Sequence, residues 1–70
     1  MMETREGWIS ISAKNQNFIC KLSNILAVHD PGSHTLIVYM AGNHVVYLEF
    51  LSKEDRVNIY NRLCDLLLEG

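Results

Sequence analysis

Three histidines are the residues of this 70-residue chain best suited to chemistry: His29, His34 and His44. If Pro31 and Gly32 make a tight turn, His29 and His34 become cross-strand neighbours, which is the spacing of a two-histidine metal site. His44 begins the following strand, which places it on the order of 20 Å away at about 3.3 Å per residue. Because zinc sites take three or four ligands, we expect surface histidines and no bound metal.

Nucleophilic or acid–base catalysis would need a nucleophile, a base and an orienting acid within reach of one another. His29 and Asp30 are adjacent, but adjacent strand residues point to opposite faces and so do not form a dyad. No pair of carboxylates converges, and the glycines lie at turns and ends rather than in a phosphate-binding loop. The sequence therefore predicts a protein that is not an enzyme and has no cofactor.

Cys20 and Cys64 are the two cysteines of the chain, and both lie within apolar runs. A free cysteine behaves as a small hydrophobe, so we expect two buried, reduced thiols. A single disulfide between Cys20 and Cys64 remains open, because both residues map to the same layer between sheet and helix.

Charge and hydropathy argue against several classes of partner. The formal net charge is −2, and the six lysines and arginines are scattered along the chain. Dedicated nucleic-acid binders carry a basic face, so nucleic acid and anionic membranes are not expected partners. No apolar run approaches the ~20 residues of a membrane span, and no N-terminal signal pattern is present. We expect a cytoplasmic protein.

Alternation of apolar and polar residues predicts strands over residues 8–13, 18–22, 25–30, 35–40 and 44–50. Residues 52–69 have a helical period with Ser52 as the N-cap, and the polar residues 1–6 are expected to be disordered. The chain is thus predicted to be one α+β domain over residues 1–70. A four- to five-stranded antiparallel sheet covers residues 7–50, and one C-terminal helix packs on one of its faces.

Registers read from the turns divide the sheet residues between two faces. In the first hairpin we expect Ile11 to lie near Cys20, and in the last hairpin a two-residue turn sets Ile37 opposite Leu48. The inner face, which the helix covers, then holds Ile9, Ile11, Ala13, Phe18, Cys20, Leu22, Leu26, Val28, Ile37, Tyr39, Val46, Leu48 and Phe50. The helix is expected to dock through Tyr60, Leu63, Cys64 and Leu67.

The opposite face of this predicted sheet carries an apolar patch of a size that soluble monomers seldom expose. The helix is also apolar over an arc of about 200°, whereas packing on one sheet needs only somewhat more than ~100°. We therefore expect an interface with a second copy or a larger protein partner that contains Ile25, Leu36, Val38, Met40, Val45, Tyr47, Ile59 and Leu66. A slipped register, or strands buried on both sides by their own chain, is the alternative.

Two families resemble parts of the chain in the order and spacing of these elements. Residues 18–50 carry a strand, a short link with Asn24, an apolar strand, a glycine turn and a last strand, and this resembles small bacterial proteins of the flagellar FlbD type. The junction of last strand and helix, residues 47–55, is similar to the positive-cofactor family of single-stranded-DNA-binding coactivators, which dimerise. The chain lacks the dense Lys and Arg of that family's DNA-facing strands, and neither resemblance transfers functional residues.

The function predicted from the sequence is that of a small non-catalytic protein-interaction or regulatory module, homodimeric or bound to a larger partner. The alternative is a weak single-stranded nucleic-acid-binding module, in which aromatic residues such as Trp8, Tyr39 and Tyr47 would stack on bases. Salt-dependent oligonucleotide binding distinguishes the two, because binding to phosphates releases counterions.

Overall fold

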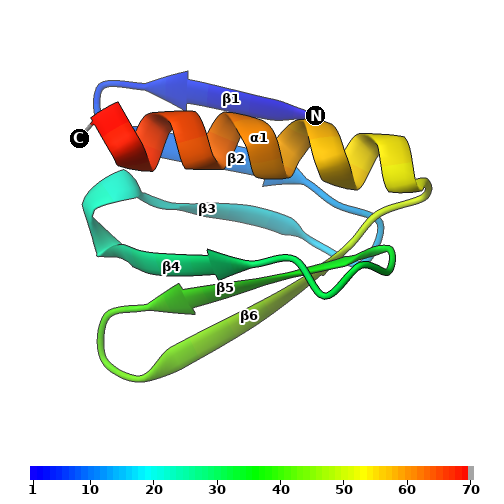
Figure 1. Cartoon of the computed structure of the whole chain (residues 1–70). Helices are drawn as coiled ribbons and strands as arrows, with labels where there is room; N and C mark the ends of the chain where they lie inside the picture. The colour runs from blue at the N-terminus through cyan, green and yellow to red at the C-terminus, as the bar shows by residue number, and fades with distance from the viewer. Residues whose placement is uncertain (70) are drawn as a thin grey trace.

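The computed structural model describes residues 1–69 and contains six antiparallel strands in two sheets, followed by one long helix (Figure 1). Sheet A consists of β1 (Met2–Arg5), β2 (Trp8–Ser12) and β3 (Asn17–Lys21). A short 3-10 helix, η1 (Leu22–Asn24), leads to sheet B, which consists of β4 (Ile25–His29), β5 (Thr35–Met40) and β6 (His44–Glu49). The C-terminal helix α1 spans Lys53–Glu69. The α+β class is confirmed, but the single sheet is wrong, because η1 separates two three-stranded sheets.

Strand β1 is a second difference from the prediction, which treated residues 1–6 as disordered. β1 pairs with β2 along its whole length, and Met2 is buried in the core. Glu6 and Gly7 connect the two strands with φ angles of 48° and 86°. Two-residue hairpin turns favour positive φ at both positions, so this turn sets the register of the hairpin.

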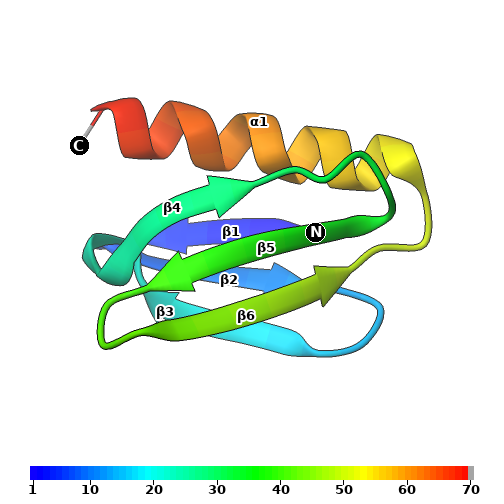
Figure 2. The same ribbon diagram turned by 60° about the horizontal axis from the view of Figure 1, so that its bottom comes forward.

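The two sheets pack face to face, and α1 lies along one side of the sandwich, beside the edge strands β1 and β4 (Figure 2). Ser52 caps the helix as predicted, because its Oγ accepts a hydrogen bond from the Asp55 N–H at 3.1 Å. Near the middle of α1, Arg62 Nη1 donates to the carbonyl oxygen of Met2 at 2.8 Å. The helix is thereby attached to sheet A as well as to sheet B.

The core lies between the sheets and beneath the helix, and it contains Met2, Ile9, Ile11, Cys20, Ile25, Leu36, Val38, Leu48, Phe50, Ile59 and Leu63. In sheet A the predicted inner face is correct for Ile9, Ile11 and Cys20. Their register differs from the prediction, because Ile9 rather than Ile11 lies opposite Cys20. A shift of two residues keeps every side chain on its face, since strand side chains alternate with a period of two.

In sheet B the register differs from the prediction by one residue. The loop between β5 and β6 has three residues rather than two, and Gly42 and Asn43 within it have φ angles of 83° and 64°. Leu36 therefore pairs with Leu48, a residue that was predicted to lie opposite Ile37. A one-residue slip moves all the side chains of one strand to the other face. The predicted inner positions of Ile37 and Tyr39 are wrong for this reason.

Strand β4 contains an irregularity that changes its faces in the same way. The register shifts between Ile25 and Ala27, which marks a β-bulge at Leu26. A bulge places an additional residue on one strand and re-aims the side chains around it. Ile25 is consequently buried, and Leu26, predicted to face inward, is 68% exposed.

Candidate interaction surface

Four apolar or aromatic side chains gather on the outer face of sheet B, which is turned away from the core and is called the outer B face below. Ile37 and Tyr39 come from β5, and they lie opposite Tyr47 and Val45 of β6. Tyr39, Val45 and Tyr47 are 40%, 43% and 57% exposed. Cross-strand neighbours on one face have Cβ atoms about 5 Å apart, so these four residues form one contiguous patch.

The border of this patch is polar at one end of the sheet. Thr35 and Glu49 lie opposite each other there, and His29 of β4 faces outward beside Ile37. None of the outward-facing residues of β4, β5 and β6 is a lysine or an arginine. The face is thus suited to an apolar partner surface, with one carboxylate at its margin.

The predicted interface residues divide into a buried group and an exposed group. Leu36 and Val38 are 0% exposed, and Ile25 and Ile59 also belong to the core. Met40 and Leu66 are partly buried and pack against the core. The predicted place on an outer sheet face is therefore wrong for Leu36, Val38 and Met40, because of the one-residue register of β5, and for Ile25, because of the bulge in β4. On α1, Ile59 packs into the core, whereas Leu66 is only partly buried. Val45 and Tyr47 do lie on the outer B face.

The outer face of sheet A has a different composition. Trp8 lies between Arg5 and Lys21 across the strands, and Ser10 separates Glu3 from Ile19. The Lys21 Nζ is 5.7 Å from the centre of the Trp8 ring, within the range of a cation–π contact. Charged side chains thus surround the exposed apolar residues of this face, which is typical of a solvated sheet surface.

The free edge of β6 is partly covered by the loop that follows β2. Asn15 Nδ2 and Gln16 Nε2 both donate to the Tyr47 carbonyl oxygen at 3.0 Å. Asn15 Oδ1 accepts from the Glu49 N–H at 3.0 Å, and the Lys14 N–H donates to the Glu49 carbonyl oxygen. The side chain of Asn15 therefore bonds to β6 much as a neighbouring strand would. Sequence reasoning treated this segment only as a hairpin loop, and no local signal points to a partner 32 residues away.

The histidines do not come together in the way that a tight turn at Pro31–Gly32 would have required. His29 lies opposite Ile37, because the connection between β4 and β5 extends from Asp30 to His34. His44 lies opposite Met40 at the other end of β5. Within residues 1–69, no group of three or more His, Cys, Asp or Glu side chains is arranged to hold a metal ion.

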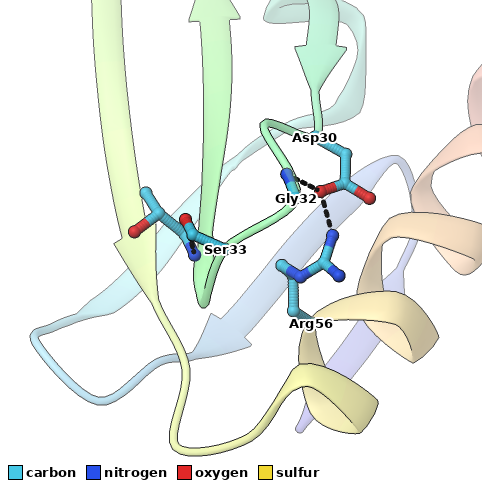
Figure 3. Close-up of polar contacts among 5 residues, drawn as sticks. Asp30, Gly32, Ser33 and Arg56 are labelled. Carbon is cyan, nitrogen blue, oxygen red and sulfur yellow. Dashed lines mark hydrogen bonds and ion pairs between the residues drawn. The ribbon is translucent and has the colours of Figure 1, made fainter.

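An ion pair fixes the start of α1 to the end of β4 (Figure 3). Arg56 Nη1 donates to Asp30 Oδ1, which also accepts from the Gly32 N–H at 2.9 Å and so holds the loop in an Asx turn. Arg56 is 6% exposed, and its Nε has no hydrogen-bond partner among residues 1–69. This pair has an evident structural role, because it connects the helix, the loop and the strand end.

Two surface hollows lie outside the patch of Ile37, Tyr39, Val45 and Tyr47. One of about 560 Å³ opens beside the loop before β5 and is lined by Lys14, His34, Glu49 and Lys53, among others. A more apolar hollow of about 350 Å³ lies near the C-terminal end of α1. It is lined by Gly7, Leu22, Ser23, Ile25, Leu66 and Leu67. Two of the predicted interface residues, Ile25 and Leu66, therefore border a surface recess although they do not lie on the outer B face.

The two cysteines are free in this structure. Cys20 is buried between the sheets, and this burial raises the pKa of its thiol. Cys64 is partly buried on α1, where a hydrogen bond with its side chain raises the pKa of Tyr60. A raised pKa makes a thiol less nucleophilic at neutral pH, so Cys20 is suited to packing rather than to reaction.

Comparisons with known proteins give no relative from which a function could be transferred. No protein family, no curated protein and no solved structure matches the chain. The resemblances to the FlbD type and to the positive-cofactor family therefore stay predictions. Among residues 1–69, no helix is long and apolar enough to cross a membrane.

Proposed function

We propose that the protein is a non-catalytic interaction module that self-associates through the outer B face. The observation that carries the proposal is the contiguous patch of Ile37, Tyr39, Val45 and Tyr47, in which Ile37 is half-buried and the other three are exposed although the chain has a core between its sheets. Exposed apolar area is unfavourable by about 25 cal/mol per Å². Covering this patch would recover that free energy on association.

The composition of the patch favours a protein surface as the partner. Tyrosine is enriched at protein interfaces because its ring contributes area and its hydroxyl group still bonds to water or to a polar neighbour. Glu49 is the one charged side chain among the outward-facing residues of β5 and β6. Two copies can therefore approach without bringing many like charges together, and a two-fold arrangement places the same patch on both sides of the interface.

Single-stranded nucleic acid is the alternative partner, and the distribution of cations disfavours it. Stacking platforms combine aromatic rings with a positively charged groove. Here Tyr39 and Tyr47 lie on the outer B face, whereas Arg5 and Lys21 lie on the outer face of sheet A beside Trp8. Binding of an oligonucleotide that weakens steeply with salt and is lost in Tyr47→Glu would favour this alternative over the proposal.

The proposal is tested by sedimentation equilibrium and light scattering from low micromolar to millimolar concentration. We expect the native protein to show a concentration-dependent dimer and Tyr47→Glu to remain monomeric and folded. Ile19→Glu is the matched control, since Ile19 is an exposed apolar residue of an edge strand on the outer face of sheet A. The Ile19→Glu variant should dimerise like the native protein. A native protein that is monomeric throughout, or equal loss of dimer in both variants, would contradict self-association through this face.

A further inference from the structure

Three connections that are far apart in the sequence meet at the end of the sandwich where α1 begins (Figure 1, Figure 2). They are the loop after β2, the loop between β4 and β5, and the link from β6 to α1. The hollow of about 560 Å³ lies at this end, and residues from all three connections line it. Small-molecule sites have volumes of about 300–1,000 Å³, so this hollow is large enough for a ligand.

Hydrogen bonds between backbone groups fix the three connections to one another. The Lys14 N–H donates to the Glu49 carbonyl oxygen at 2.6 Å, and the Phe50 N–H donates to the His34 carbonyl oxygen at 2.8 Å. The ion pair drawn in Figure 3 anchors the loop between β4 and β5 to α1. The positions of the lining residues are therefore set by the fold, although most of their side chains are exposed.

The side chains that line the hollow are more cationic than the protein as a whole. Lys14 and Lys53 are two of only six lysines and arginines in a chain whose formal net charge is −2. Glu49 is the one carboxylate among the described lining residues, so with a neutral His34 the hollow has one net positive charge. Within residues 1–69, neither lysine forms a salt bridge with a carboxylate. The two ammonium groups are thus available to an anionic ligand.

Hydroxyl groups beside the lysines supply neutral hydrogen-bond donors. Ser33 Oγ accepts a hydrogen bond from the Thr35 N–H at 3.3 Å. A hydroxyl oxygen that accepts in this way can still donate its own proton to a ligand. Thr35 lines the same hollow. Ammonium and hydroxyl donors around one hollow are suited to a ligand group with several acceptor oxygens.

We propose that this hollow binds the phosphate group of a small phosphate monoester, with Lys14 and Lys53 as its cationic partners and Ser33 as a hydroxyl donor. At neutral pH such a group carries a charge of about −1.5 to −2 and has three strong acceptor oxygens. Its charge matches the two lysines, and its oxygens match two ammonium groups and a hydroxyl. A carboxylate fits less well, because arginine recognises its planar pair of oxygens, and no arginine is among the described lining residues.

The part of the ligand beyond the phosphate meets Glu49. The carboxylate of Glu49 accepts hydrogen bonds from hydroxyl groups, but it repels a second anionic group. The ligand class is therefore a monoester whose remainder carries hydroxyl groups, such as a sugar phosphate. Thr35 and Glu49 also lie at the margin of the outer B face, but the phosphate site is complete in a single chain. The inference therefore does not depend on self-association.

Amide NMR titration of the native protein tests the site with three probes: ribose 5-phosphate, inorganic phosphate and ribose. Ribose 5-phosphate should give saturable shifts of the amide signals of Lys14, Ser33, Thr35 and Lys53. Inorganic phosphate should bind at the same residues but more weakly, and ribose should not bind. If neither phosphate compound shifts these signals at millimolar concentration, or if ribose binds as well as its phosphate, the phosphate site is wrong. If inorganic phosphate binds as tightly as ribose 5-phosphate, the assignment to a monoester is overturned.

Two double variants with the same change in charge distinguish a site from general attraction. Lys14→Gln combined with Lys53→Gln should raise the dissociation constant for ribose 5-phosphate about tenfold or more, because two charge-assisted contacts are lost. The matched control is Arg5→Gln combined with Lys21→Gln on the outer face of sheet A. At physiological salt, where distant charges are screened, it should change that constant by less than about twofold. Circular dichroism checks that both variants are folded, and equal weakening in the two would overturn the site.

Glu49→Gln gives a readout in the opposite direction. Replacing the carboxylate with an amide removes its repulsion of the phosphate and keeps a hydrogen-bond acceptor. The dissociation constant for inorganic phosphate should therefore fall about two- to fivefold, which is the size expected of an exposed charge pair. Unchanged or weaker binding of inorganic phosphate by folded Glu49→Gln would contradict a phosphate bound in this hollow.

Discussion

The two sheets have similar inner faces but different outer faces. Both turn aliphatic side chains toward a shared core, for example Ile11 in sheet A and Leu36 in sheet B, and both of these are 0% exposed. Outside, sheet A alternates apolar residues with charged and hydroxyl side chains, whereas the centre of sheet B presents Tyr39, Val45 and Tyr47. The core is formed by the inner faces, so the apolar outer B face lies outside it. This difference supports the proposal that the outer B face serves in binding.

The largest expected effect is on stability, and it distinguishes the buried face of β5 from its exposed face. Val38→Glu should unfold the protein, because an unpaired carboxylate in the core should destabilise it by more than about 4 kcal/mol. Total stability in so small a domain is of similar size. Tyr39→Glu, one residue along, should stay folded because its side chain faces solvent. Circular dichroism and urea unfolding measure both variants, and the opposite ranking would mean that the β5 faces are reversed.

A second substitution tests which face of α1 packs on the core and stabilises the protein. Leu63 is 0% exposed, and Leu63→Ala should lower the free energy of unfolding by about 2–5 kcal/mol. The control is Leu68→Ala on the same helix, at a side chain that is mostly exposed. It should change the free energy of unfolding by no more than about 0.5 kcal/mol. Similar losses for the two variants would show that the helix packs through another face.

The ion pair between Asp30 and Arg56 allows a finer test of how sheet B holds the helix. Asp30→Ala should destabilise by about 2–4 kcal/mol, because it leaves the buried Arg56 charge unpaired and removes the acceptor of the Gly32 N–H. Arg56→Met should cost less, since it removes a buried Nε that has no partner and leaves Asp30 partly exposed to water. Urea unfolding gives the ranking, and a larger loss for Arg56→Met would contradict it.

The smallest expected effect concerns the thiol on the inner face of sheet A. Burial raises the pKa of Cys20 in the folded state, so the unfolded state loses its thiol proton at a lower pH than the folded state. The free energy of unfolding should then fall as the pH rises above about 8.5 and level off beyond the folded pKa. Cys20→Ala should show a shallower fall over the same range. An equally steep pH dependence in both proteins would assign the effect to other groups.

The sequence predicts the alternation of each strand more securely than the pairing between strands. In the first hairpin the predicted register was wrong by two residues, so Ile9 and Ile11 still fell on the correct face. In the last hairpin the error was one residue, so Leu36 and Val38 were placed outside although they are buried. Both errors come from the positions of the loops. The first loop covers residues 13–16 rather than 14–17, and the last loop includes Ala41 as well as Gly42 and Asn43.

Other features lie beyond local sequence patterns because their partners are far apart in the chain. Arg56 and Asp30 are separated by 26 residues, and Asn15 and the Tyr47 carbonyl by 32. The helix cap at Ser52 was predictable, since its partner Asp55 lies three residues away. The expectation of an apolar outer face on the later strands remained useful, but only Val45 and Tyr47 of the eight predicted residues are part of the outer B face.

The most direct test of the central proposal compares the aromatic side chains of the two outer faces within one sample. Hydroxyl-radical footprinting reports the solvent exposure of Tyr39 and Tyr47 on sheet B and of Trp8 on sheet A, and all three are exposed in the single chain. As the concentration rises from micromolar to millimolar, oxidation of Tyr47, and to a smaller extent of Tyr39, should decrease while that of Trp8 stays constant. Protection of Trp8 without protection of the tyrosines, or no change in any of the three, would contradict the assignment of binding to the outer B face.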